Sequence, residues 1–240
     1  MTRVAVLGAA GRMGSTVCDA VAADAELELV ARIDVDDSLD AAVENRAEVA
    51  VDFTTPDSVK ANVLWLLEHG VHCVVGTTGL SDDDLAEIGQ HAQRSPANCF
   101  VAPNFAVGAV LMMHFAAQAA PYFGRAEISE RHHEHKLDAP SGTSLRTAEL
   151  MNRSRGSKWD EVDTSEPSRG LDVGGINVHS LRVPGSVAHQ EVILGSPGQT
   201  LTIKHDSLDR ASFMPGVILA VKNVASLPGL TVGLEHLLDL

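Results

Sequence analysis

The stretch that decides the fold runs from Arg3 to Gly14 and reads R-V-A-V-L-G-A-A-G-R-M-G. Its first five residues are β-branched or apolar apart from Arg3, and Gly8, Gly11 and Gly14 follow at a spacing of three before a helical pattern that runs through Ala23. A strand, a glycine turn and a helix in this order open the dinucleotide-binding α/β fold, because glycines let the backbone approach a pyrophosphate at the helix N-terminus. The spacing G-x-x-G-x-x-G is less specific than G-x-G-x-x-G, so its context must support it.

The next strand supplies that context. A run from Leu27 to Ile33 ends in Asp34, about 20 residues beyond the last glycine, where an acidic side chain can accept hydrogen bonds from a ribose. Asp34 favours NADH because a carboxylate repels a 2′-phosphate, whereas the guanidinium of Arg12 could bind that phosphate, so use of both cofactors is reasonable. The alternative is that the glycines only make a tight turn and that Asp34 is a solvated loop residue.

Strands and helices then alternate. Further strands are predicted at 48–53, 71–75 and 98–102, with one helix from Pro56 to about His69 and another after Ser81 as its N-cap. Ligands bind at the carboxyl ends of strands in open parallel sheets, so Thr77, Thr78 and Asn104 are candidate neighbours of a nicotinamide. The pattern predicts a Rossmann-type dinucleotide-binding domain.

A second domain of α+β type is predicted after Ala106. An apolar helix from Val107 to Tyr122 leads into it, and a polar segment, 154–172, is interpreted as a mobile loop. Alternating strands are expected at 126–136 and, in three runs, across 176–206, with a hairpin turn at 195–198. They would form an open mixed sheet with a helix on one face and a second copy of the chain on the other, which predicts a homo-oligomer.

The segment from Glu130 to Thr143, E-R-H-H-E-H-K-L-D-A-P-S-G-T, concentrates the chemistry. If the strand continues to Lys136, then His132 and Lys136 share one face and offer a proton donor beside an ammonium. After a break at Ala139-Pro140, a helix is expected over 143–153, with Ser141, Gly142 and Thr143 at its N-terminus. Free N–H groups and the helix dipole favour a carboxylate or phosphate at that N-terminus.

Composition excludes several classes of protein. The 240 residues have a formal net charge of −14, and the 18 Lys and Arg form no basic patch, so we expect no nucleic-acid partner. The sequence contains no apolar run of roughly 20 residues and no leader, so we expect no membrane partner and a cytoplasmic location. Cys18, Cys73 and Cys99 are widely spaced among apolar residues, as buried reduced thiols would be.

These motifs together resemble the 4-hydroxy-tetrahydrodipicolinate reductase (dihydrodipicolinate reductase) family over essentially the whole chain. The resemblance implies a dinucleotide-binding domain of residues 1–106 and 217–240, and a substrate-binding and tetramerisation domain of residues 107–216. It also implies a homotetramer that reduces a small cyclic dicarboxylate with NADH or NADPH in lysine and diaminopimelate biosynthesis. Some members have Arg after the acidic residue, whereas Val35 follows Asp34 here, which argues against a strong NADPH preference.

The resemblance also implies roles for individual residues. His132 corresponds to the proton donor and Lys136 to a second catalytic group, while His133, Gly142 and Thr143, with Ser141 from the helix-start argument, are candidate substrate-binding residues. The implied cofactor residues are Gly8, Ala9, Ala10, Gly11, Arg12, Met13, Asp34, Gly76, Thr77, Thr78, Ala102, Pro103, Asn104 and Phe105. No metal is expected.

Two rival hypotheses remain. A metal-dependent hydrolase could use His132, His133 and His135 as ligands, but adjacent histidines on a strand face opposite ways. A non-catalytic dinucleotide sensor would need only the Rossmann domain, and it would leave the histidine-rich segment without a role.

Overall fold

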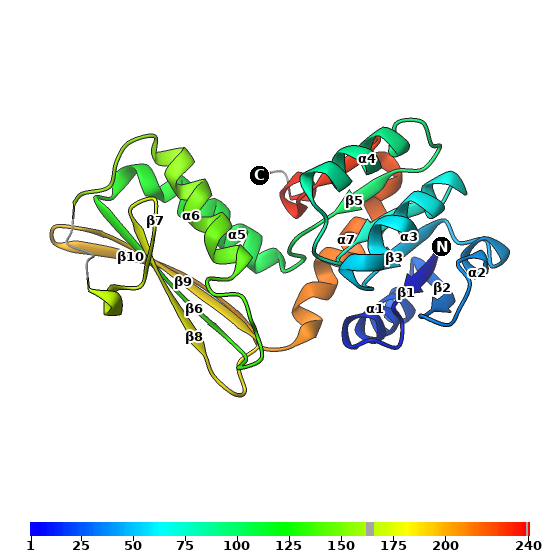
Figure 1. The fold of residues 1–240 in the computed structure, drawn as a ribbon, viewed down its shortest axis with the longest axis horizontal. Helices are drawn as coiled ribbons and strands as arrows, with labels where there is room; N and C mark the ends of the chain where they lie inside the picture. Colours follow the sequence, from blue (N-terminus) through cyan, green and yellow to red (C-terminus); the bar gives the residue numbers. More distant parts are fainter. Residues whose placement is uncertain (162–165, 239) are drawn as a thin grey trace. The chain divides into compact units, whose positions relative to one another are not determined.

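The chain forms two compact units, and each is built on a sheet of its own (Figure 1). The computed structural model describes residues 1–161, 166–238 and 240. Unit 1 comprises Met1–Ala106 and Phe213–Leu240, and unit 2 comprises Val107–Ser212. Unit 1 resumes at Phe213, slightly before the predicted residue 217. Gly216 explains this boundary, because an added Cβ there would lie 2.1 Å from the carbonyl oxygen of Phe105, so the chain is already packed on unit 1.

Unit 1 is a parallel sheet of six strands in the order β11-β5-β4-β3-β1-β2. Its inner strands are largely apolar and buried, as expected where helices cover both faces of a parallel sheet, while the edge strands β2 and β11 are partly exposed. Five of them lie within one or two residues of their predicted positions. They are β1 (Thr2–Leu7), β2 (Leu27–Ile33), β3 (Val49–Asp52), β4 (His72–Val75) and β5 (Cys99–Val101), and the last strand is β11 (Leu230–Val232).

The C-terminal tail completes this sheet. Leu230 pairs with Cys99 and Val232 with Val101, so β11 extends the edge at β5. This pairing spans more than a hundred residues of chain, so local periodicity cannot assign it.

Helices cover both faces of the sheet. Ala5 and Leu7 belong to a core cluster with α2, α3 and α4, whereas Val4 and Val6 point to the face where α1 and α7 contact each other. Both α3 and α4 begin with capping boxes, at Thr55 and Ser81 respectively. The helices are α1 (Arg12–Ala23), α2 (Asp40–Glu44), α3 (Pro56–Glu68), α4 (Asp82–Ala92) and α7 (Met214–Asn223), and the short α2 was not predicted.

The three cysteines lie in this core as free thiols, as expected. Burial raises the pKa of Cys73 well above its usual value, which keeps that thiol protonated. In the part of the chain that the structure describes, no helix is both long and apolar enough to cross a bilayer.

Unit 2 is a mixed sheet in the order β10-β9-β6-β8-β7, with β6 parallel to β8 and the other pairs antiparallel. Helices α5 (Val107–Ala119) and α6 (Gly142–Arg155) pack on it, and the predicted hairpin joins β9 to β10. The α/β fold class and the open mixed sheet are therefore confirmed. The strands are β6 (Arg125–His132), β7 (Leu171–Val173), β8 (Ile176–Arg182), β9 (Ala188–Ser196) and β10 (Gln199–Ser207).

Two predictions in unit 2 were wrong. Strand β6 ends at His132 rather than Lys136, because its neighbours stop there: His132 pairs with Arg182, the last residue of β8, and with Ala188, the first of β9. The chain then turns, with Lys136 N donating to His133 O at 3.1 Å.

The segment predicted as a mobile loop, 154–172, is partly packed. Its first residues belong to α6, and Trp159 is buried and donates from Nε1 to Asn152 Oδ1 at 2.6 Å. The side chain of Arg155 lies over the Trp159 ring at 4.4 Å. Residues 162–165 of this segment lie outside the described residues.

We predict opposite effects for two helical glycines in unit 1. An added Cβ at Gly14 in α1 would lie 2.0 Å from the carbonyl oxygen of Gly8, so Gly14→Ala should lower the free energy of unfolding by more than about 2 kcal/mol. At Gly89 in α4 the nearest atom would be Leu230 Cδ2 at 3.6 Å, so Gly89→Ala should raise it by about 0.5–1 kcal/mol through helix propensity. Urea denaturation measures both, and equal effects would refute the close contact.

Candidate functional site

The glycine turn of unit 1 is held tightly between the ends of its neighbouring strands. Gly8 has φ +72°, and an added Cβ would lie 2.5 Å from the carbonyl oxygen of Phe53. Gly8 N and Ala9 N donate to Ile33 O at 2.8 and 3.2 Å, which ties the turn to the end of β2. Helix α1 follows with Gly11 as N-cap and no side-chain cap, so its first N–H groups are open to an anion.

Asp34 joins this turn directly. Its Oδ2 accepts from Ala10 N at 2.7 Å and its Oδ1 from Val35 N at 2.9 Å. The bonds from Ala10 and Val35 hold the pKa of Asp34 below its usual value, so the group is a carboxylate at neutral pH. Each oxygen keeps a lone pair that can accept a further hydrogen bond.

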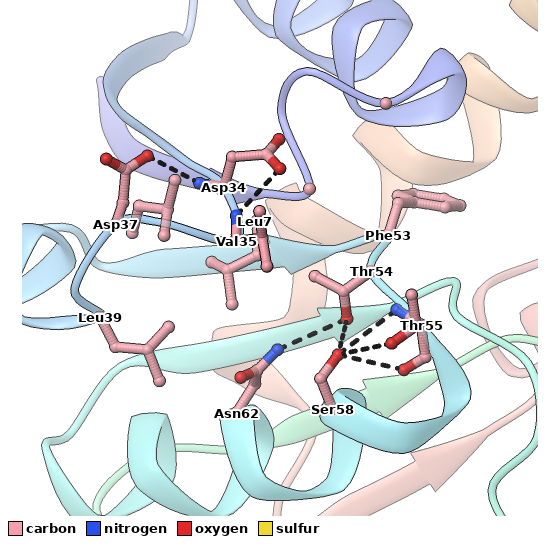
Figure 2. A pocket seen from close by; sticks show the side chains of 13 residues that line it. Leu7, Asp34, Val35, Asp37, Leu39, Phe53, Thr54, Thr55, Ser58 and Asn62 are labelled. Carbon is pink, nitrogen blue, oxygen red and sulfur yellow. Dashed lines mark hydrogen bonds between the residues drawn. The ribbon is translucent and has the colours of Figure 1, made fainter.

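A pocket of about 410 Å³ opens beside Asp34 (Figure 2). Leu7, Ile33 and Leu39 give it apolar walls, and a polar side is formed by Thr54, Ser58 and Asn62 of the β3–α3 region. Size, apolar walls and a carboxylate at the rim suit an adenosine. Because added side chains at Gly8 and Gly14 would also collide with backbone, the residues present fit a dinucleotide.

Asp52 organises the next two turns and was missed by sequence reasoning. Its buried carboxylate accepts from Thr54 Oγ1 and Thr77 Oγ1, both at 2.7 Å, and from Asn62 Nδ2 at 2.9 Å. The signal was present in the sequence, since V-A-V-D is an apolar strand that ends in an acid. One buried carboxylate thus fixes the predicted Thr77 beside residues that line the pocket.

The remaining predicted cofactor residues also lie at the carboxyl ends of the strands. Ala102 N donates to Val75 O at 3.1 Å, and Ala106 N donates to Asn104 Oδ1 at 2.8 Å. Phe105 is buried and its ring centroid is 6.0 Å from that of Phe53. Gly76 is half-buried, and its N–H donates to Asp52 O at 3.0 Å. Thr78, Pro103 and Arg12 are exposed, and Met13 is half-buried.

The second group of candidate residues lies in unit 2, around the end of β6. Glu130 is 1% exposed, and its carboxylate accepts from His132 Nδ1 and from Ser141 N, the latter at 3.3 Å. The sequence predicted His132 and Ser141 as functional residues but not the buried glutamate between them. Strand β6 and the start of α6 therefore meet at one carboxylate.

Arg182 at the end of β8 is the second residue that the sequence did not single out. Its Nη1 and Nη2 donate to Glu130 Oε2 and Oε1 at 3.0 and 2.9 Å, a two-pronged pair. Burial raises the pKa of Glu130, but hydrogen bonds from His132 and Arg182 outweigh it and lower the pKa from 4.5 to about 2. Glu130 is therefore charged at neutral pH.

Lys136 lies in the loop between β6 and α6. Its Nζ is 2.7 Å from Asp138 Oδ1, and its side chain is 23% exposed. His133 is exposed, with its ring centroid 6.4 Å from that of His135. Within residues 1–161, 166–238 and 240, no three His, Cys, Asp or Glu side chains are grouped so as to hold a metal.

Helix α6 begins one residue earlier than predicted, at Gly142, with Ser141 as N-cap. Ser141 Oγ accepts from Ser144 N at 3.2 Å, and Ser144 Oγ donates to Gln190 Oε1 at 2.9 Å. Gly142 has open space where a Cβ would be, and Thr143 is half-buried. Glu130 and Gln190 thus hold the N-terminus of α6 in place, and Gly142 leaves it accessible, which suits an anionic ligand.

A Rossmann-type nucleotide pocket together with a histidine–carboxylate pair at a helix N-terminus defines a dinucleotide-dependent oxidoreductase. Family models described as dihydrodipicolinate reductase, N-terminus and C-terminus, match residues 2–105 and 108–238. The chain belongs to the dihydrodipicolinate reductase family.

Known relatives cover the whole chain. The 4-hydroxy-tetrahydrodipicolinate reductases of Beutenbergia cavernae and Corynebacterium diphtheriae are 54% and 52% identical to it, each over 99% of both chains. A solved structure, the dipicolinate-bound dihydrodipicolinate reductase of Paenisporosarcina sp. TG-14, is 38% identical, has a TM-score of 0.88 and covers 98% of this chain and 99% of its own. These relatives are enzymes, which argues against the dinucleotide-sensor hypothesis.

We predict that Glu130 makes stability depend on pH in the acid range. Its pKa is lowered in the folded chain, so its charge stabilises the fold above about 4.5, and this contribution is lost as pH falls from there toward about 2. Between about pH 6 and about pH 3, wild type should lose about 2 kcal/mol more unfolding free energy than Glu130→Gln, which has no proton to gain. Urea denaturation at both pH values measures this difference, and parallel losses would contradict it.

Proposed function

We propose that this protein reduces 4-hydroxy-tetrahydrodipicolinate to tetrahydrodipicolinate with NADH or NADPH and release of water, in lysine and diaminopimelate biosynthesis. Family membership over the whole chain and a dipicolinate-bound structural relative support the substrate class. The observation that carries the proposal is the meeting of His132, Glu130 and the start of α6 at the end of β6. It brings a proton donor and an anion site together in one unit.

Unit 1 is the proposed dinucleotide-binding domain. The N-terminus of α1 would bind the pyrophosphate, with residues 8–13 forming the glycine turn and the first residues of the helix, and Asp34 would accept hydrogen bonds from the adenosine ribose. Gly76 to Thr78 and Ala102 to Phe105 would surround the nicotinamide end, where Asp52 keeps Thr77 in place. When bound, the reduced nicotinamide supplies the hydride.

Unit 2 is the proposed substrate domain. The substrate is a ring with two carboxylates, and the start of α6, where Ser141 is the N-cap and Gly142 and Thr143 follow, would bind one of them. The Lys136 ammonium, now paired with Asp138, would bind the same anion or its neighbour, and exposed His133 would add a donor. Two anchoring points would fix the orientation of the ring, which is what a directional hydride transfer requires.

His132 is the proposed general acid. Loss of the 4-hydroxyl as water gives a conjugated imine, and after reduction the adjacent enamine carbon must be protonated. Because Glu130 accepts a hydrogen bond from His132 Nδ1, the other nitrogen, Nε2, is the one that can donate to a ligand. Lys136 can assist as a second catalytic group by its charge.

We also propose a homotetramer in the cytoplasm. The face of the unit 2 sheet opposite α5 and α6 leaves Leu181 and Ile193 at 44% and 37% exposed, and a further copy of the chain would cover them. Free thiols at all three cysteines agree with a reducing compartment.

The test of the function is steady-state reduction with substrate made in situ by an upstream synthase. His132→Gln should lower kcat by roughly 10²-fold with unchanged cofactor affinity, as expected for a lost general acid. Lys136→Ala should in addition weaken binding of pyridine-2,6-dicarboxylate, measured by calorimetry. His135→Gln is the matched control, because its side chain is 84% exposed in the same loop and should behave as wild type. Full activity of His132→Gln would reject its assigned role.

Asp34 should set the choice between cofactors. Asp34→Ala removes a charged acceptor and the repulsion of a 2′-phosphate, so the ratio of kcat/KM for NADH over that for NADPH should fall by about tenfold. Asp36→Ala is the control, since Asp36 is exposed and does not line the pocket. A ratio that is equal in wild type and Asp34→Ala would exclude the ribose contact.

A further inference from the structure

We propose that Glu130 and Arg182 are positioning residues: together they hold the His132 ring, the loop of Lys136 and the start of α6 in one arrangement. The inference deepens the proposed function and rests on it. Neither residue needs to touch the substrate, and both would act through the groups that do.

Glu130 has the contacts of a positioning group. Its side chain is fully buried, and each of its oxygens accepts one bond from Arg182 and one bond from a site element, His132 at Oε2 and Ser141 N at Oε1. A buried ion pair is often replaceable by apolar residues without loss of stability, so stability alone does not require this pair here. An apolar pair, however, could not accept hydrogen bonds from both the ring nitrogen of His132 and the backbone N–H of Ser141.

Arg182 extends the same arrangement to the loop. Its Nη2 donates to Asp138 O at 2.6 Å and its Nε to Lys136 O at 3.3 Å, while Nη1 and Nη2 also donate to the Glu130 carboxylate and Nη1 to Leu181 O. Within the loop, Lys136 N donates to His133 O and Lys136 Nζ pairs with Asp138. Arg182 is therefore the link between the backbone of Lys136 and the buried carboxylate.

The arrangement also selects the form of the histidine. A charged carboxylate can only accept, so the proton between Glu130 and His132 belongs to Nδ1. The low pKa of Glu130 keeps it in that state at neutral pH. The neutral ring is then a single tautomer with Nε2 free to gain and give the catalytic proton. Glutamine would remove this selection, because its amide can donate as well as accept.

Two variants separate the two roles. Glu130→Gln should lower kcat by roughly 10²-fold with a smaller change in KM, and the ¹⁵N spectrum of His132 should lose the single Nδ1–H tautomer. Arg182→Lys keeps the positive charge beside Glu130 but cannot reach both loop carbonyls. It should keep the tautomer and weaken pyridine-2,6-dicarboxylate binding by about tenfold.

The chain offers a matched control on the same strand. Glu127 also pairs with a histidine and an arginine, at 2.9 Å to His179 Nε2 and 2.5 Å to Arg169 Nη2, but it points to the opposite face of the sheet. Glu127→Gln should leave the His132 tautomer and dicarboxylate binding as in wild type. All variants are compared at the same oligomeric state, measured by sedimentation.

The outcomes keep this inference distinct from the proposed function. If wild type reduces no substrate, the function is rejected, whereas the tautomer and dicarboxylate binding still test the positioning roles. If wild type is active, a Glu130→Gln protein with the wild-type tautomer and kcat overturns the inference alone. Should Glu130→Gln not fold, Glu130→Asp keeps the charge on a shorter side chain, and unchanged kcat and tautomer in that variant would likewise overturn it.

Discussion

A buried carboxylate must be surrounded by donors, and in unit 2 this requirement falls on Glu130. Its donors come from its own strand, from the end of β8 and from the start of α6, so satisfying one charge brings three separate elements to a single point. Had the same position been apolar, β6 could have packed equally well on the helices. Nothing would then have fixed the ring of His132 or the entry into α6.

Unit 1 uses a related arrangement with different partners. Asp52 is as buried as Glu130, but the donors described for it are neutral: Thr54, Thr77 and Asn62. Glu130, by contrast, is paired with the guanidinium of Arg182. In both units a carboxylate at or near the end of a strand fixes the turns that carry the candidate ligand-binding residues. Each site is therefore supported by a strand rather than by a loop alone.

Sequence patterns predicted unit 1 well because most of its strands are apolar runs that end at a glycine, a proline or a small polar residue. These patterns failed where tertiary contacts determine the local structure. Strand β6 stops at His132 because its partners stop, and Trp159 fixes a segment whose composition is typical of a loop. Arg182 lies 52 residues from Glu130, and no periodicity links them. The functional histidine was visible through its motif, but the groups that orient it were not.

The place of β11 in the sheet has a consequence for synthesis of the chain on the ribosome. Strand β5 is made before any residue of unit 2, yet its outer neighbour comes from the tail, at Leu230–Val232. Throughout translation of the inserted unit, the nascent sheet exposes an apolar edge with unpaired N–H and C=O groups, the kind of edge that recruits foreign strands. The Rossmann sheet can therefore be completed, and this edge covered, only after residues 230–232 have been synthesised.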